Sequence, residues 1–134
     1  MHEHRVQIYY EDTDHSGVVY HANYLKYFER AREHMLGTAE LRRLLEEDGI
    51  GFVVYKAELT YKKGARFGDT VAIRTRVEKD SAYRATFSQD AYRGEELLVE
   101  GRVQLVCVDA SEKLVPLPAS AVRSIEAHPG TDRA

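Results

Sequence analysis

The sequence has little that would suit export, a membrane or a nucleic acid. Cys107 is the only cysteine among the 134 residues, so no disulfide can form within the chain, and an oxidising compartment gains no support. No apolar run approaches the roughly 20 residues that a membrane-spanning helix needs, and the N-terminus "MHEHRVQ" lacks the apolar centre of a signal peptide. The net charge is -3 without a block of like charge, which disfavours a nucleic-acid partner. We therefore expect a cytoplasmic protein with no membrane insertion.

The residues that are present suit one globular domain. Hydrophobic residues make up 43% of the chain and charged residues 31%, a balance typical of a folded protein rather than a disordered one. A length of 134 residues is enough to bury a core and suits a single domain spanning residues 1–134. Cys107 lies in the apolar run "VQLVCVD", so we predict a buried, inert thiol there rather than a nucleophile.

The first part of the sequence predicts a strand, a turn and two helices. The stretch "RVQIYYE" is rich in β-formers and predicts a first strand, and "TDHSGVV" has turn chemistry. Apolar residues then recur at spacings of three and four, which predicts a helix with Asn23 as its N-cap and Gly37 at its end. The recurring positions are Tyr24, Phe28, Ala31 and Met35. A second, shorter helix is predicted for "TAELRRLLEEDG", which ends at Gly49.

The rest of the chain is predicted to be mostly strand. Four segments are long, and several alternate in polarity: "GFVVYKAELTYKK", "DTVAIRTRVEK", "YRATFSQDAYR" and "ELLVEGRVQLVCVD". The joints "GARFGD", "KDSA" and "RGEE" have loop or hairpin character, Pro116 and Pro118 end the last strand, and "ASAVRSIEA" predicts a terminal helix. Early helix followed by four consecutive antiparallel strands indicates an α+β domain with helix on one sheet face. Because such a sheet has exposed edges, we expect a homo-oligomer that pairs them.

The stretch "YYEDTDHSGVVYHANY" gathers acids, a histidine and tyrosines just before the predicted helix. A turn at Ser16 and Gly17 would bring Tyr10, Asp14 and His21 together at the helix start. Unpaired backbone N–H groups and the positive end of the helix dipole favour negative charge there. A carbonyl oxygen held at this point would be polarised, and a carboxylate beside it could attack the carbonyl carbon or deprotonate a water. These parts suit acyl transfer to water.

Each of these residues also has an ordinary structural interpretation. Asp12 and Asp14 can be turn formers, since aspartate hydrogen-bonds its own loop backbone. His21 can be a satisfied polar residue near the helix start, and Tyr10 can be an ordinary strand aromatic. Only the joint placement of these residues favours catalysis.

Other chemistries lack their motifs. Asp14, His15 and Ser16 are the residue types of a catalytic triad, but neighbours in sequence cannot easily aim at one another in triad geometry, and there is no G-x-S-x-G elbow. No H-E-x-x-H occurs and the six histidines are scattered, which disfavours zinc. No complete G-x-G-x-x-G or Walker-type loop is present. We therefore expect neither a metal nor a cofactor.

The stretch "YYEDTDHSGVVYHANYLKYFERAREHML" closely resembles the acyl-CoA thioesterase family with the hotdog fold. The resemblance is to the 4-hydroxybenzoyl-CoA thioesterase-like branch that includes the tol–pal-associated, YbgC-like enzymes. That family has the pattern Y-x-x-T/C-D-x-x-G-V/I-V-Y-x-x-N-Y leading into a long helix. Two further matches are "FVVYKAELTYKKGARFGDTVAIRTRV" and "LVCVD" followed by "PLP", so the resemblance covers nearly the whole chain. It implies an antiparallel sheet wrapped around a long central helix.

Carried over to this sequence, the family pattern gives Asp14 the position of the catalytic carboxylate. His21 and Tyr10 match the histidine and tyrosine that accompany it, and Asp12 has no such role. The resemblance therefore implies hydrolysis of an acyl-CoA or acyl-carrier thioester to a free acid, with coenzyme A as part of the substrate. In this reading the helix-start amides of Asn23 and Tyr24 would hold the thioester oxygen.

The resemblance also implies dimers, or tetramers built as dimers of dimers, with active sites at the subunit interface. The helix start of one subunit would face the partner's strand around Val54 and Tyr55. Three cations of a basic turn could meet the phosphates of coenzyme A, although a solvated hairpin explains their charges equally well. They are Lys62, Lys63 and Arg66.

Two departures from the family pattern and two rival functions stay open. Gly64 stands where many relatives have proline, and His15 and Ser16 replace small or proline residues, which could alter the acyl pocket. A hydratase or dehydratase of acyl thioesters shares the fold, but its catalytic residues lie on the long helix. The second rival is a non-enzymatic protein that binds acyl-CoA or an acyl carrier.

Overall fold

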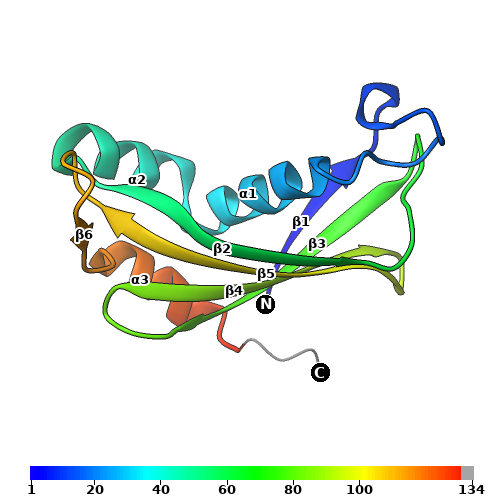
Figure 1. Cartoon of the computed structure of the whole chain (residues 1–134). Helices are drawn as coiled ribbons and strands as arrows, with labels where there is room; N and C mark the ends of the chain where they lie inside the picture. The colour runs from blue at the N-terminus through cyan, green and yellow to red at the C-terminus, as the bar shows by residue number, and fades with distance from the viewer. Residues whose placement is uncertain (131–134) are drawn as a thin grey trace.

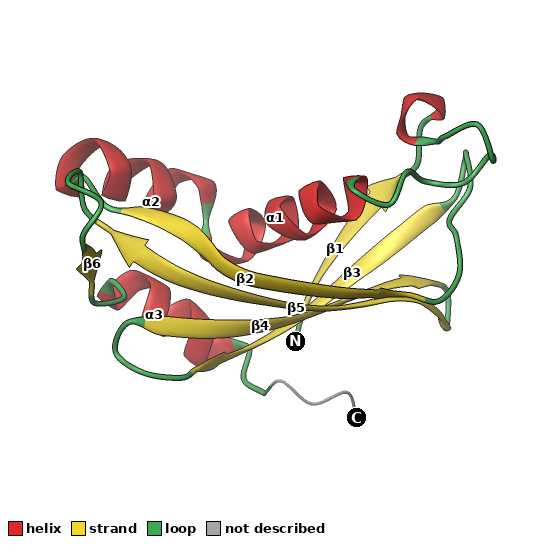
Figure 2. Ribbon diagram, in the orientation of Figure 1, coloured by secondary structure: helices red, strands yellow, loops and turns green. Residues whose placement is uncertain are grey.

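A computed structural model of the chain describes residues 1–130, so the last four residues of the predicted domain lie outside it. Residues 1–130 form six strands, three α-helices and two single turns of other helix types. Figure 2 shows how the helices and strands follow one another along the chain. In chain order they are β1 His2–Gln7, the 3₁₀ turn η1 Tyr10–Asp12, α1 Asn23–Leu36, α2 Thr38–Arg43, the π-helical turn η2 Leu44–Asp48, β2 Gly51–Tyr61, β3 Thr70–Lys79, β4 Arg84–Arg93, β5 Glu96–Val108, β6 Leu114–Val115 and α3 Ala119–Ala127.

The strands make one antiparallel sheet, and the long helix α1 lies across one of its faces (Figure 1). The order along the sheet is β1-β3-β4-β5-β2, and β6 pairs with the end of β5. Helix α3 contacts both α1 and β3. The α+β class with helix on one sheet face is therefore confirmed.

The sheet order corrects the simplest interpretation of four consecutive strands. Strand β2 does not pair with β3; it crosses to the far edge and pairs with β5, from Gly51 opposite Val108 to Tyr61 opposite Val99. The segment between β2 and β3 is therefore a crossing connection and not a hairpin. The joints between β3 and β4 and between β4 and β5 do link neighbouring antiparallel strands, as predicted.

Helix α1 begins at Asn23 and ends before Gly37, whose φ of 97° ends it in a conformation that suits glycine. The predicted N-cap is wrong by one residue, because Ala22 holds that position. The side chain of Asn23 instead donates from Nδ2 to the carbonyl oxygen of Asp12 at 2.9 Å, which ties the preceding loop to the helix. The second predicted helix is confirmed as α2 and η2, and the terminal helix as α3.

The first strand begins and ends earlier than the predicted stretch "RVQIYYE", because it starts at His2. Strand β1 ends at Gln7, and residues 10–12 turn into η1 because the carboxylate of Asp12 accepts the backbone N–H of Tyr9 at 2.7 Å. A local side-chain acceptor of this kind competes with a strand ladder. Tyr10 therefore lies in a turn and not on a strand.

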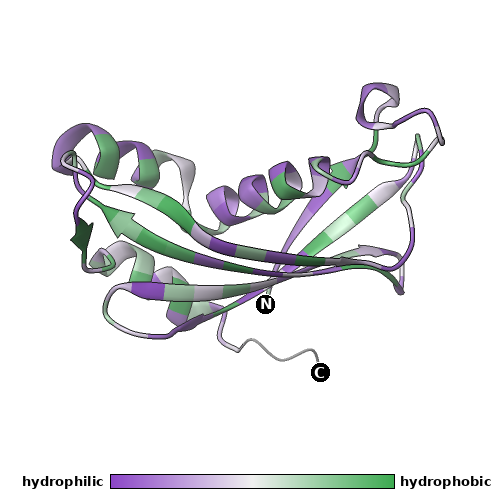
Figure 3. Cartoon of the chain, viewed as in Figure 1, coloured by the Kyte–Doolittle hydropathy of each residue, from purple (hydrophilic) through white to green (hydrophobic). Residues whose placement is uncertain are grey.

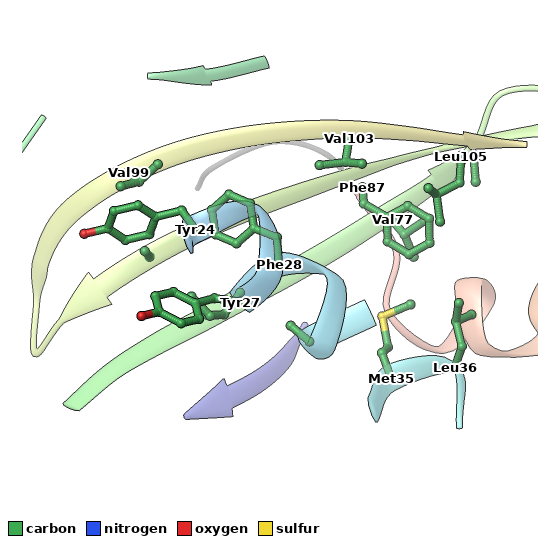
Figure 4. Packing of buried hydrophobic residues seen from close by; sticks show 14 of the residues in the cluster. Tyr24, Tyr27, Phe28, Met35, Leu36, Val77, Phe87, Val99, Val103 and Leu105 are labelled. Atoms are coloured by element: carbon green, nitrogen blue, oxygen red, sulfur yellow. The ribbon is translucent and has the colours of Figure 1, made fainter. Parts of the chain in front are cut away.

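The core lies between α1 and the sheet and is built from aromatic and branched side chains (Figure 4). Tyr24, Tyr27 and Phe28 on α1 are almost fully buried against strand residues such as Phe87 and Val103. Along the strands apolar positions recur, whereas much of the outer surface of α1 and α2 is hydrophilic (Figure 3). Amphipathic elements of this kind fix which face of each packs inward.

Two smaller residues complete the core. Cys107 is fully buried, and burial raises the pKa of its thiol to about 12, which agrees with the predicted inert role. Gly101 on β5 leaves the space that Phe28 fills, because a Cβ there would stand 2.5 Å from the Phe28 ring and 2.8 Å from the carbonyl oxygen of Gln89. The close approach of α1 to the sheet depends on this glycine.

Candidate active site

The loop that precedes α1 is held by backbone hydrogen bonds at both of its ends. The N–H of Asp14 donates to Val18 O at 2.9 Å, which closes the turn that Gly17 makes with a φ of 82°. The N–H of Val19 donates to Ala65 O at 2.9 Å and docks the loop on the segment after β2. These bonds hold the loop in one position, and residues of a catalytic site have to be held in this way.

Asp14 is half-buried in this loop and lines an open pocket of about 290 Å³ together with His21. Its Oδ1 accepts the backbone N–H of Ser16 at 2.8 Å, so the turn-forming interpretation of Asp14 is correct. The turn-forming and catalytic interpretations of Asp14 are compatible, because Oδ1 accepts the bond that shapes the turn and Asp14 also lines the pocket.

Tyr61 is a pocket residue that sequence reasoning missed. Its hydroxyl donates to the carbonyl oxygen of His21 at 3.1 Å, and the two rings lie with centroids 6.0 Å apart. Burial raises the pKa of Tyr61, so the hydroxyl stays protonated and keeps donating at neutral pH. Forty positions separate the two residues in sequence, and only the docking of β2 beside the helix start brings them together.

The start of α1 differs from the expected row of unpaired amides. The N–H of Asn23 donates to Tyr20 O at 2.9 Å, that of Tyr24 to His21 O at 3.4 Å and that of Leu25 to Ala22 O at 3.2 Å. This tight first turn satisfies the amides that were predicted to hold a carbonyl oxygen. Within residues 1–130 the preceding amides, those of His21 and Ala22, have no acceptor.

Tyr10 is not brought to the pocket. It sits in η1 with 79% of its surface exposed, and its ring contacts Phe67 at a centroid distance of 6.0 Å. Tyr10 is not among the residues that line the pocket with Asp14 and His21. The geometry thus supports Asp14 and His21 as a pair and gives Tyr10 no place beside them.

The basic turn is only partly free to meet a phosphate. Lys62 and Lys63 line the same pocket, but Lys62 pairs with Glu100 at 3.4 Å and Lys63 with Glu96 at 2.7 Å. These exposed pairs are weak and can exchange for a stronger anion. Arg66 is exposed nearby and makes no ion pair with the described residues.

Val54 and Tyr55 lie on β2, the last strand of the sheet, and both are exposed. Val54 lines a hollow between β2 and the two helices α1 and α2. A β-bulge follows it, and the ring of Tyr55 lies against the guanidinium of Arg84 at 5.6 Å. Tyr55 is therefore the extra residue of the bulge and has no partner on β5 in the register, which no pattern in the sequence predicted.

Comparison with known proteins places this arrangement in a family. A model of the Thioesterase-like superfamily matches residues 9–125, which include the loop, helix α1 and every strand of the sheet except β1. The chain belongs to this superfamily. The Acyl-CoA thioester hydrolase YbgC of Escherichia coli O6:H1 is 40% identical over 121 residues, 87% of this chain and 90% of that protein. The Acyl-CoA thioesterase YbgC of Haemophilus influenzae is 40% identical over 106 residues, 78% of each chain.

A solved structure agrees with the family assignment. A probable thioesterase from Bartonella henselae superposes with a TM-score of 0.82 at 32% identity, covering 87% of this chain and 98% of the other. The predicted family, the hotdog fold and the thioesterase class are confirmed by these matches. None of the helices in residues 1–130 is long and apolar enough to cross a membrane.

Proposed function

We propose that this thioesterase hydrolyses acyl-CoA thioesters to a free carboxylic acid and coenzyme A. Two relatives at 40% identity carry acyl-CoA thioesterase names. The observation that carries the proposal is the pocket at the start of α1, which Asp14 and His21 both line. A carboxylate and an imidazole at one opening suit base and acid roles in the same reaction.

The pocket residues divide the chemistry between them. Asp14 removes a proton from a water as the water oxygen attacks the thioester carbon, and the C–S bond then breaks. His21 delivers a proton to the departing thiolate, which leaves as the thiol of coenzyme A. The free N–H of His21, at the positive end of α1, supports the developing negative charge on the carbonyl oxygen in place of the paired amides of Asn23 and Tyr24.

A second route uses Asp14 as a nucleophile. The carboxylate attacks the carbonyl carbon, expels the thiolate and forms a mixed anhydride that water then hydrolyses. One turnover in oxygen-labelled water separates the routes. Label in the Asp14 carboxylate supports the anhydride, whereas label in the product acid alone supports direct attack by water.

Replacing Asp14 by Asn tests the assignment, because the amide keeps the size of the side chain and its bond to Ser16 but loses the base or nucleophile. We expect kcat to fall by at least ~100-fold on the best acyl-CoA of a panel, measured by thiol release. Asp12→Asn is the matched control, since its carboxylate caps η1 and lies outside the pocket. Near wild-type turnover of Asp14→Asn would refute the proposal, and an equal loss in both variants would point to damage of the loop.

The complete site is proposed to form in a homodimer, which can stack into a tetramer. The exposed edge of β2 is the surface that supports this arrangement, with Val54 and Tyr55 of one subunit facing the helix start of the other. The phosphates of coenzyme A are proposed to bind at the opening of this pocket, to the cationic side chains of Lys62, Lys63 and Arg66. The reaction so described needs no cofactor and suits the cytoplasm, where acyl-CoA is found.

A further inference from the structure

Arg32 is a buried cation without an opposite charge beside it. Its side chain lies on the inner part of α1, and only 6% of the residue is exposed. Within residues 1–130 no carboxylate lies at ion-pair distance from the guanidinium, which donates from Nη1 to the neutral Oε1 of Gln89 at 2.9 Å. Burial lowers the pKa of Arg32 to about 10, and the charge of Glu29 offsets this only in part. Burying a charge without an opposite charge beside it costs folding free energy.

Gln89 holds the guanidinium in one orientation. Its Nε2 donates to the carbonyl oxygen of Phe28 at 2.9 Å and to Oγ1 of Thr75 at 3.1 Å, and all of these groups are buried. The amide oxygen of Gln89 is therefore fixed in position and can face only Arg32. Among residues 1–130 one of the five N–H donors of the guanidinium has an acceptor, and the planar group is preorganised for a second one.

Arg32 forms part of the wall of a hollow of about 500 Å³ between α1, α2 and β2. Most of the other wall residues are apolar: Leu36, Leu41, Leu45, Ile50, Phe52, Val54 and Leu105. The remaining charged groups in the wall are Glu29, Glu33 and Arg42, and Arg42 pairs with Glu46 at 2.9 Å. A suitable occupant is an aliphatic chain that ends in one polar oxygen.

The polar groups of the wall decide which oxygen fits. A hydroxyl accepts a hydrogen bond from Arg32 and can donate its own proton to the carboxylate of Glu33 or Glu29. A carboxylate would meet Arg32 but would also face both glutamates, so like charge opposes it. The chemistry of the hollow therefore favours a hydroxyl group over an anion.

The hollow lies in line with the pocket at the helix start. Leu25, Glu29, Arg32 and Leu36 follow one another at spacings of three and four, so they share one face of α1. His21 precedes Leu25 by four residues, just before the start of α1, and Leu25 is exposed along this face. Arg32 comes nine residues after Asn23, roughly 14 Å along the helix axis at the usual rise per residue. A long acyl chain can bridge this distance.

We propose that Arg32 is a specificity-determining residue that binds a hydroxyl oxygen at the far end of the acyl group. The preferred substrates are then thioesters of long aliphatic acids that carry a hydroxyl near the chain end. This inference rests on the thioesterase function proposed above, because it places the thioester at the start of α1.

The test compares two substrates that differ in one oxygen, dodecanoyl-CoA and ω-hydroxydodecanoyl-CoA, by thiol release. The wild-type protein is expected to show a kcat/KM that is roughly 10- to 100-fold higher for the hydroxylated substrate, the range of one hydrogen bond to a charged group. Arg32→Met keeps the length of the side chain and removes its donors. The preference is expected to disappear in this variant through a higher KM for the hydroxylated substrate, while kcat/KM for dodecanoyl-CoA does not fall, because its methyl end makes no hydrogen bond with Arg32.

The outcomes separate this inference from the proposed function. Failure of the wild-type protein to hydrolyse either substrate, or any other acyl-CoA, overturns the function itself. Hydrolysis of both substrates with equal kcat/KM overturns the role of Arg32 and leaves the function intact, without need of any variant. If Arg32→Met does not fold, Arg32→Lys keeps the charge but lacks the planar fork that directs separate N–H groups at Gln89 and at a substrate, so its preference is expected to fall as well.

Discussion

At the scale of single residues, Asp14 joins a structural task to the proposed chemistry. One carboxylate oxygen closes the turn through Ser16, and the group stands in the wall of the pocket with His21. The sequence predicted both tasks, because turn-forming acids and catalytic acids favour the same kind of loop. Tyr61 could not be predicted in the same way, since no local pattern links it to His21.

Gly101 offers a test of how closely α1 must approach the sheet. In Gly101→Ala the new Cβ would overlap the Phe28 ring, so the helix or the ring must shift. We expect the free energy of unfolding to fall by about 1–3 kcal/mol, the usual effect of an overfilled core. Chemical denaturation measures it, and Gly51→Ala is the control because nothing lies within 4 Å of a Cβ there. Equal stability of the two variants would mean that α1 can move away from β5 without loss of stability.

At the scale of elements, most helix ends were predicted correctly from local residue types. The wrong predictions lie where a side chain bonds to a residue outside its own helix or strand. Gly37 and Gly49 end helical segments as predicted, with φ values of 97° and 66°. The predicted N-cap of α1 and the predicted end of β1 were wrong, because the side chains of Asn23 and Asp12 bond to the loop before α1. A sequence pattern predicts helix periodicity and caps, but it does not predict which loop a polar side chain will bond to.

The ends of β1, α1 and α3 bring four histidines together, which predicts a loss of stability in acid. The rings of His2 and His128 lie 5.5 Å apart and those of His4 and His34 lie 4.5 Å apart. Burial lowers the pKa of His2 and of His4, and each is lowered further by neighbouring histidines and, for His4, by Arg30. The unfolded chain therefore binds more protons than the folded chain, so stability is complete above a pH of about 6.5 and falls below it.

Chemical denaturation between pH 7 and pH 5 measures this loss. We expect His4→Gln to lose less stability over that interval than the wild-type protein, because one lowered pKa is removed. His15→Gln is the matched control, since His15 is exposed and outside the group of four. An identical pH dependence in all three proteins would show that the contacts between the rings are without effect.

At the scale of the whole molecule, the two edges of the sheet differ. Strand β1 is short and mostly polar, which protects that edge, whereas β2 is long and exposes Val53, Val54 and Tyr55. The sequence predicted a free edge and an oligomer but not the order of the strands. Strand order depends on pairings between distant residues, and a single sequence carries no record of these.

Val53→Lys tests the edge of β2, and it avoids the residues that line either hollow. Lysines brought face to face across a two-fold axis repel each other, so we expect the dimer to dissociate and the activity per chain to fall with it. Light scattering coupled to gel filtration reports the mass, and thiol release reports the activity. Leu114→Lys places the same charge at another exposed apolar residue and is expected to change neither. A monomeric variant with full activity would show that one chain holds a complete site.

The position of β2 at the edge beside β5 also sets the course of folding. Residues 51–61 emerge from the ribosome long before residues 96–108, the only strand within residues 1–130 that pairs with them. Closing so long a loop is slow, and proteins rich in such distant pairings fold slowly for their size. Until residues 96–108 have been synthesised, the backbone groups of residues 51–61 are unpaired and their valines are exposed to solvent. The nascent chain is therefore most prone to aggregate in this period.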